Sequence, residues 1–308
     1  MAKKNDVKWG RSRIITAVKI LAMLLVLSFI LSWITSLFIG GSMSGNTALI
    51  KVEGMIVPSG GGVLGSDLAV SEDIRELLKE ADEDPSVKAI VLEINSPGGS
   101  PVASDEIGRA IKETNKTTIA VIRDTGASGG YWVASAADHV IANRMSITGS
   151  IGVTASYLEF SGLIQDYNVT YRRLVSGEYK DVGSPLRELE PEERGMFQDI
   201  LDKLHDEFVE EVAENRNLPK DEVEEIADGM FFLGSRAKEL GLVDQLGGRQ
   251  EAKAYIRENL NMTADFREYK KEKTLADILM RSLSSQSFSI GKGIGAALTE
   301  DRSYLARI

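Results

Sequence analysis

Apolar and polar positions follow two periods along the middle of the chain, and together they predict an α/β fold. Residues 89–94 are nearly all apolar, which is typical of a parallel strand covered on both faces. The i, i+3, i+4, i+7 spacing of a helix that buries one side comes shortly before, at Ile74, Leu77, Leu78 and Ala81. This order predicts a parallel sheet with right-handed crossovers.

The alternation continues toward the carboxyl terminus. Further strands are predicted at 48–52, 118–122, 139–142 and 171–175, and further helices at 107–111 and 129–137. Pro191 suits the first position of a long helix, and Pro219 starts another. The long helix carries one continuous apolar stripe, formed by Met196, Ile200, Leu204, Phe208 and Val212.

The amino-terminal region has a different pattern. Residues 20–39 contain no charged side chain, and as a helix they reach about 30 Å, the thickness of the hydrocarbon core of a bilayer. A cleaved signal peptide is the alternative, but its apolar region is shorter, about 7–15 residues, and ends at small residues of the A-x-A type. Phe38-Ile39-Gly40-Gly41-Ser42 fits that site poorly. We therefore expect an uncleaved transmembrane helix in contact with membrane lipid.

Charge is distributed unevenly. The chain has 36 basic and 46 acidic residues, a net charge of −10, but residues 1–19 hold six basic residues and one acidic residue. The positive-inside rule predicts a cytoplasmic amino terminus and an extracytoplasmic body, in a single-pass protein of the cell membrane. The acidic body disfavours a nucleic-acid-binding protein, which needs a basic surface.

Composition removes several kinds of chemistry. The chain contains no cysteine, which excludes disulfides, thiolate metal sites and a cysteine nucleophile. Its two histidines, His139 and His205, are too few for a multi-histidine metal site, and no metal or cofactor is expected. A Ser-His-Asp enzyme would have to use one of them. His139 ends the stretch that Ser128 begins, and His205 lies inside the long helix, so we interpret both as structural or exposed.

Two glycine-rich segments follow predicted strands. Asn95-Ser96-Pro97-Gly98-Gly99 allows a close approach of the backbone, and its N–H groups could stabilise an oxyanion; a plain strand-to-helix turn is the alternative. Gly126-Ala127-Ser128-Gly129-Gly130-Tyr131 places a serine at a helix amino terminus, where the partial positive charge favours an alkoxide. An ordinary serine N-cap explains the second segment equally well.

Two loops offer partners for a serine nucleophile. Ser176-Gly177-Glu178-Tyr179-Lys180-Asp181 contains a lysine that would be a solvated surface residue in most proteins. It is of interest because a serine needs a base, and a lysine base must be neutral to accept a proton. Thr148-Gly149-Ser150-Ile151-Gly152-Val153 is either a simple turn or a loop whose Ser150 hydrogen-bonds that base.

In this order, the four motifs resemble the signal peptide peptidase A (SppA) family of membrane-anchored serine proteases. The segments 227–234 and 241–248 resemble the same family. The resemblance covers about residues 48–258 and implies a Clp-protease/crotonase-like fold of repeated βαβ units. It also implies a nucleophile at Ser128, a general base at Lys180, oxyanion N–H groups at Gly99 and Gly129, and a lysine-orienting role for Ser150. One copy of the domain indicates the short form of the family.

The resemblance defines the expected organisation and activity. We expect a basic segment at 1–19, a transmembrane helix at 20–39, a linker at 40–47, a Ser/Lys peptidase domain at 48–260 and a tail at 261–308. The implied activity is endopeptidase cleavage of remnant signal peptides and other short or unfolded peptides, by a closed homo-oligomer. A crotonase-like acyl-CoA enzyme and a non-catalytic membrane scaffold are the alternatives.

Overall fold

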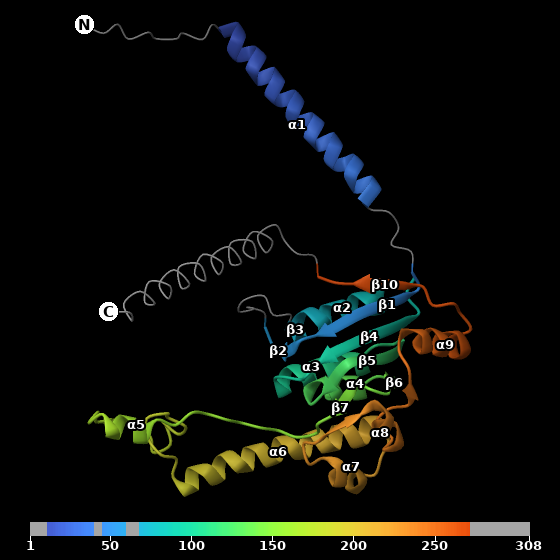
Figure 1. The fold of residues 1–308 in the computed structure, drawn as a ribbon. Coiled ribbons are helices and arrows are strands. Elements are labelled where there is room, and N and C mark those ends of the chain that lie inside the picture. The colour runs from blue at the N-terminus through green and yellow to red at the C-terminus, as the bar shows by residue number, and fades with distance from the viewer. Residues whose placement is uncertain (1–10, 40–44, 60–67, 272–308) are drawn as a thin grey trace, which may run out of the picture. The chain divides into compact units, whose positions relative to one another are not determined.

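The computed structural model describes residues 11–39, 45–59 and 68–271, and the chain divides into two units between Ser44 and Gly45 (Figure 1). The first unit contains one helix, α1 (Arg11–Ile39), whose described side chains are exposed. Among the residues that the structure describes, no helix is long and apolar enough to cross a membrane. The transmembrane helix at 20–39 stays a prediction.

A largely parallel sheet forms the centre of the second unit. The strands lie in the order β10-β1-β4-β5-β6-β9, and all neighbours in this series are parallel. Their bounds are Thr47–Glu53 for β1, Ala89–Ser96 for β4, Thr117–Ala127 for β5, His139–Ala142 for β6, Gln245–Leu246 for β9 and Phe266–Tyr269 for β10. Strands β4 and β6 are almost wholly buried, as expected of strands covered on both faces.

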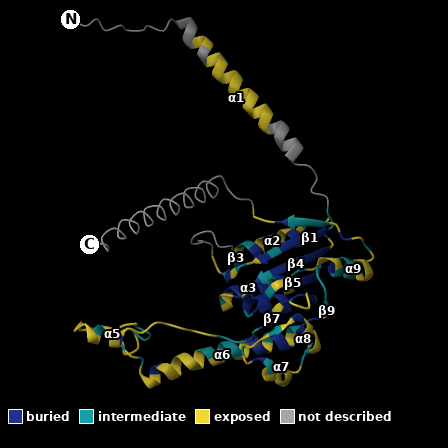
Figure 2. Ribbon diagram, viewed as in Figure 1, coloured by how far each residue is buried: buried dark blue, intermediate teal, exposed yellow. Residues whose placement is uncertain are grey.

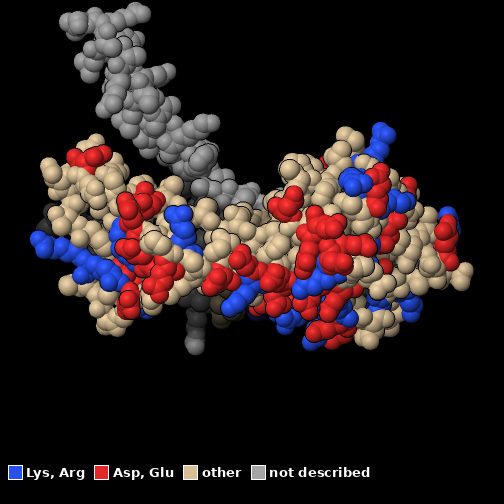
Figure 3. All heavy atoms as spheres, turned by 90° about the horizontal axis from the view of Figure 1, so that it is seen from below, with Lys and Arg blue, Asp and Glu red and all other residues tan. Residues whose placement is uncertain are grey.

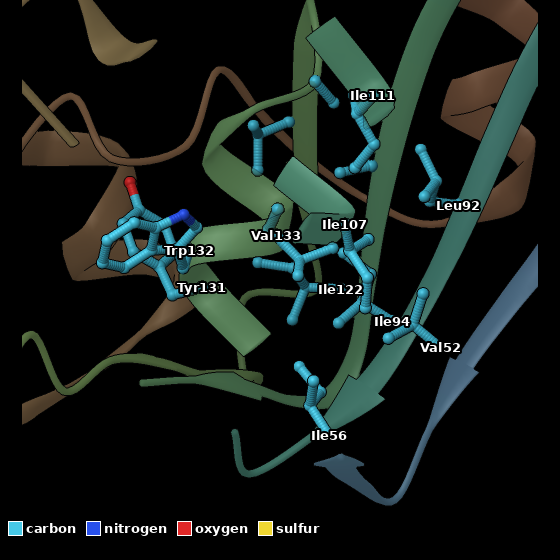
Figure 4. Close-up of a cluster of buried hydrophobic side chains, with 14 of the residues drawn as sticks. Val52, Ile56, Leu92, Ile94, Ile107, Ile111, Ile122, Tyr131, Trp132 and Val133 are labelled. Carbon is cyan, nitrogen blue, oxygen red and sulfur yellow. The ribbon is translucent and has the colours of Figure 1, made fainter. Parts of the chain in front are cut away.

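Two hydrophobic cores lie on opposite faces of this sheet. Alternate residues of β4 divide between them, with Leu92 on one face and Val91 on the other. The larger core packs α2 (Ser71–Glu83), α3 (Pro101–Lys112) and α4 (Gly129–Ser135) against the sheet, and Figure 4 shows part of it. The smaller core is covered by α9 (Arg249–Leu260). These layers match the Clp-protease-like α/β fold that the sequence predicts.

Short strands extend the sheet at the carboxyl end of β5. There β7 (Ile147–Gly149) pairs with residues 125–127, and β8 (Phe231–Leu233) lies antiparallel to β7. A separate pair, β2 (Met55–Val57) and β3 (Leu68–Val70), reaches the same region, since Ile56 bridges to Gly99. Two further helices, α7 (Lys220–Ile226) and α8 (Gly234–Glu239), flank β8. The carboxyl ends of the central strands therefore converge on the Pro97–Gly99 turn and Ser128.

The helix α6 (Pro191–Arg216) differs between its two halves. Its second half is buried at Phe208, Val209 and Val212, and the Phe208 ring lies 4.9 Å from that of Trp132 in α4. Its first half is exposed, as is the preceding segment with α5 (Ser161–Asp166) (Figure 2). We call residues 155–200 the arm. Seen from the side of α6 and α7, Asp and Glu side chains spread over much of this face, with Lys and Arg between them (Figure 3).

One sequence prediction is wrong. Residues 171–175 form no strand, because no strand of the described residues pairs with them. The apolar stripe of α6 is buried only in its second half, since Met196 and Ile200 remain exposed. The sheet continues beyond residue 260, the predicted end of the peptidase domain, because β10 pairs with β1 through residue 269. Residues 272–308 of the predicted tail, and most of the predicted segments 1–19 and 40–47, lie outside the described residues.

Candidate active site

Ser128 lies at the junction of β5 and α4 in a conformation that is rare for a serine. Its φ is 52° and its ψ is −126°, and its N–H donates to the Gly149 carbonyl over 2.8 Å. Such a positive φ costs free energy and occurs often at functional sites. The Ser128 side chain makes no capping hydrogen bond to α4. Ser128 thus occupies the N-cap position of α4, but its hydroxyl does not serve as the cap, and the residue is half-buried.

The Pro97–Gly99 turn packs directly against Ser128 and Gly129. A methyl group on Gly98, whose φ is 101°, would lie 2.7 Å from the Gly129 nitrogen and 2.9 Å from the Ser128 Cβ. Contacts to Ile56 fix the turn, because the Ile56 N–H donates to the Gly98 carbonyl over 2.9 Å. Only glycine allows so close an approach of two backbone segments.

Two backbone N–H groups lie beside the Ser128 hydroxyl. A methyl group on Gly129 would lie 3.3 Å from the Gly99 nitrogen, so the two glycines are neighbours. Gly129 begins α4, and its N–H has no intrahelical acceptor. In the turns and loops of the described residues, neither the Gly99 nor the Gly129 N–H donates to another backbone group. Two free donors next to a serine are the arrangement that stabilises the oxyanion of acyl transfer.

A pocket of about 480 Å³ opens at Ser128, and Ser150 lines it as well. Ser150 has a φ of 53°, and its N–H donates to the Met230 carbonyl over 2.9 Å. The Ser150 hydroxyl donates to the Gly229 carbonyl over 3.1 Å. The structure thus brings Ser150 to the same pocket as Ser128, with its hydroxyl bonded to Gly229.

Lys180 lies elsewhere in this chain. It is an exposed residue of the arm, between α5 and α6, and does not line the Ser128 pocket. In Figure 1 the arm extends away from the sheet along the first half of α6. Of the five predicted site residues, the structure brings together Ser128, Gly99, Gly129 and Ser150, and it does not bring Lys180 to them.

The same pocket contains a titratable residue that the sequence reasoning set aside. His205 lines it from α6, half-buried, with Nε2 2.7 Å from the Ala227 carbonyl oxygen. A carbonyl oxygen only accepts, so Nε2 is the donor in this hydrogen bond. Nothing in the sequence indicated that α6 passes beside Ser128. His139, in contrast, stacks on Tyr255 with a ring separation of 3.9 Å, a structural contact between β6 and α9.

The scaffold beneath Ser128 is tightly fixed. Tyr131 of α4 is fully buried, and its hydroxyl donates to the Leu242 carbonyl over 2.8 Å. Burial raises the pKa of Tyr131 well above its usual range, so this donor keeps its proton. Among the described residues, no group of three or more His, Asp or Glu side chains is arranged to hold a metal ion.

Comparison with known proteins identifies the family. The model of peptidase family S49 matches residues 110–263. A putative protease of Methanocaldococcus jannaschii is 34% identical over 225 residues, which cover 72% of each chain. A putative signal peptide peptidase SppA of Enterococcus faecium is 35% identical over 239 residues, 76% of this chain and 70% of that protein. Protease 4 of Haemophilus influenzae is 34% identical over 221 residues, 71% of this chain but only 35% of its own length. The chain belongs to peptidase family S49, as a short member of its SppA group.

Proposed function

We propose that this protease is a serine endopeptidase in which Ser128 is the nucleophile and Lys180 of a neighbouring copy is the general base. The observation that carries the proposal is the geometry at Ser128. A strained serine, two adjacent N–H donors at Gly99 and Gly129 and an open pocket are present, but no lysine in the described part of the chain lines that pocket. A second copy of the chain would supply the missing base.

The mechanism follows from these roles. Neutral Lys180 accepts the Ser128 proton while Oγ attacks the carbonyl carbon of a peptide bond, and the oxyanion is held by the N–H groups of Gly99 and Gly129. Lys180 returns the proton to the leaving amine, which yields an acyl-enzyme. Water, deprotonated by Lys180, then releases the acyl group. Ser150 lines the same pocket, and its hydroxyl oxygen would accept a hydrogen bond from the arriving Lys180 amine.

The surface of the arm supports assembly. Leu158, Tyr167 and Leu174 are 73%, 75% and 96% exposed, although all three are large and apolar. Apolar groups gathered on one exposed segment usually mark an interaction surface. We assign this surface to a second copy of the chain, because burying the arm against a neighbour would also carry Lys180 toward another subunit. In a closed homo-oligomer every arm is buried against a neighbouring subunit.

The substrate and location are part of the same proposal. We propose remnant signal peptides and other short or unfolded peptides as substrates, because a site formed between subunits excludes folded proteins. The relative from Enterococcus faecium, named a putative signal peptide peptidase, supports this substrate class. The uncharged run at 20–39 would anchor the enzyme in the cell membrane, with the amino terminus in the cytoplasm and the protease outside.

Mixing inactive variants tests the proposal. Ser128→Ala and Lys180→Ala proteins should each lose at least about a thousandfold in peptide hydrolysis. After dissociation and reassembly together, they should regain part of the activity, since some interfaces then pair an intact serine with an intact lysine. Ser128→Ala mixed with itself is the control. A Lys180→Ala enzyme with full activity would exclude the dyad, and absence of any recovery would place both groups in one subunit.

A further inference from the structure

The loop that carries Lys180 is held by an ion-pair cluster that the proposed mechanism does not use. It consists of two arginines, Arg173 and Arg187, and two carboxylates, Asp181 and Glu193. Three of the four side chains are well covered, with exposed fractions of 15% for Asp181, 19% for Arg187 and 5% for Glu193, and Arg173 is 37% exposed. A charge cluster covered to this extent on an otherwise exposed segment needs an explanation.

Arg173 makes contacts with residues on both sides of Lys180 in the sequence. Arg173 Nε donates to both carboxylate oxygens of Asp181, over 2.9 and 2.8 Å, and its Nη2 lies 2.7 Å from Oδ1. The same Nη2 donates to the backbone carbonyl of Glu178. One guanidinium group therefore ties down a residue on each side of Lys180. Such fork geometry is available to arginine and not to lysine.

Arg187 connects this loop to the first turn of α6. Its Nε donates to Asp181 Oδ2 over 3.2 Å, and its Nη1 donates to Glu193 Oε2 over 2.7 Å. Glu193 in turn accepts the Glu190 N–H over 3.0 Å, in the capping box of α6. The other end of α6 packs on α4, where Asn215 Nδ2 donates to Ser135 Oγ over 3.1 Å. The lysine loop is thus joined through one helix to the element that begins at Ser128.

The cluster also explains why Lys180 has no acidic partner among the residues that the structure describes. Among the described residues, the Lys180 ammonium group takes part in no ion pair, although Asp181 is its neighbour in sequence. Hydrogen bonds from Arg173 and Arg187 hold the pKa of Asp181 well below its usual range. Both carboxylate oxygens already have charged donors, which leaves the lysine free to point away from its own loop.

We propose that Arg173 and Arg187 are positioning residues that clamp the Lys180 loop onto α6 and present its amino group to the active site of the neighbouring copy. The inference rests on the proposed Ser/Lys mechanism. A base that is misplaced by about 1 Å costs about a hundredfold in rate, so a clamp on both flanks of Lys180 has a direct catalytic consequence.

Arg173→Gln in the full chain tests the clamp, with Arg172→Gln as the matched control. Arg172 is the adjacent arginine, it is exposed, and it has no ion pair among the described residues. Hydrolysis of a fluorogenic apolar peptide should lose about 10-fold to 100-fold in kcat for Arg173→Gln, with KM changed by less than about threefold. Arg172→Gln should retain the parent values. Arg173→Lys keeps the charge but not the fork, and should recover little of the loss.

A double variant separates positioning from a general structural effect. In a Lys180→Ala background, Arg173→Gln should cause no further loss of the residual rate, because the group that it positions is already absent. An equal loss in both backgrounds would overturn the clamp, as would full activity of Arg173→Gln or full rescue by Arg173→Lys. If Arg173→Gln does not assemble, Asp181→Asn takes its place with the same expectations. Full activity of Lys180→Ala would instead reject the dyad itself, so the two failures are distinct.

Discussion

The core and the arm build their halves of the proposed site by different means. Around Ser128, position is set by buried strands, glycine contacts and backbone hydrogen bonds, such as the 2.8 Å bond from Ser128 to Gly149. Around Lys180, position is set by ion pairs on an exposed segment, above all those of Arg173 and Arg187 with Asp181. The surroundings of the proposed nucleophile are therefore complete within one chain, whereas the proposed base is held by ion pairs and would need a neighbouring copy to reach Ser128.

The largest expected effect on the core half comes from Gly129→Ala. The new methyl group would lie 2.3 Å from Ser104 Oγ and 3.3 Å from the Gly99 nitrogen, so it would disturb both oxyanion donors. Loss of such a donor costs about a hundredfold to a thousandfold in kcat. Steady-state kinetics measure the loss, and thermal unfolding measures the stability.

Ser104→Ala is the matched partner for this variant. Added to Gly129→Ala, it removes the hydroxyl that clashes with the methyl group and should restore part of the stability, while kcat stays low. Recovery of parent activity in the double variant would mean that the methyl group acts only through its clash with Ser104, and that its closeness to the Gly99 nitrogen does not disturb the site.

Leu163→Glu should disrupt assembly through the arm and leave the fold of the core unchanged. Leu163 lies on α5 and is 54% exposed, so the single chain tolerates a charge there. Burying that carboxylate in an interface is unfavourable, and the assembly should dissociate at low protein concentration with a loss of activity of tenfold or more, roughly the effect of a lost interface anchor.

Sedimentation and activity measured over the same concentration series test Leu163→Glu. Met145→Glu, at a 64% exposed position between β6 and β7, is the control and should change neither quantity. A fully active monomeric Leu163→Glu protein would remove the need for a neighbouring copy.

The same contrast between the buried core and the exposed arm explains which parts of the fold and of the site could be predicted from the sequence. The buried strand at 139–142 has the predicted bounds, and α2 buries Ile74, Leu78 and Ala81 as its spacing requires. Local apolar periodicity is reliable where the fold covers both faces of a strand or one face of a helix. The motif at Ser128, a serine between small residues after a buried strand, was also noticed from local signals, but these left the N-cap alternative open, and only the family resemblance implied a nucleophile there.

The failures concern features that local pattern does not encode. β10 has the sequence Phe-Arg-Glu-Tyr and lies in the sheet because it pairs with β1, more than two hundred residues earlier in the chain. Residues 171–175 have the composition of a strand but no partner. Periodicity places Ile200 and Phe208 on one stripe, but only Phe208 meets the core. His205 lies in the Ser128 pocket because α6 passes beside it. The position of a helix in the tertiary structure is not encoded in its local sequence pattern.

Acid should weaken the core through two ion-paired carboxylates, the buried Glu93 and the partly exposed Asp244. Burial raises the pKa of Glu93, but hydrogen bonding to Arg249 and the nearby charge of Arg123 outweigh it, so the pKa of Glu93 is lowered. Asp244 behaves in the same way, with Arg216 as its main partner. A carboxyl group whose pKa is lowered on folding stabilises the protein above its unfolded pKa, about 4, and this contribution is lost as the pH falls below that value.

Melting temperatures measured between pH 7 and pH 3 test this effect on the core. The melting temperature should fall by several degrees over the lower half of that range, roughly what a loss of 1–2 kcal/mol produces. Glu93→Gln should lower the melting temperature at pH 7 and make its decline with acid shallower. An unchanged acid dependence in Glu93→Gln would show that this carboxylate is not responsible.

The smallest effect on activity is expected for His205→Gln. This variant tests most directly whether the general base lies in the arm or in the core. His205 lies in the Ser128 pocket, and the core would be self-sufficient if this ring were the base. Its Nε2 donates to the Ala227 carbonyl, however, and a glutamine amide can donate the same bond. With Lys180 as the base, His205→Gln should keep kcat within about threefold and leave the pH profile unchanged, whereas removal of a general base costs about a hundredfold or more. A loss of that size would indicate that the general base is His205 of the core and not Lys180 of the arm. Lys180→Ala should then retain activity as a monomer.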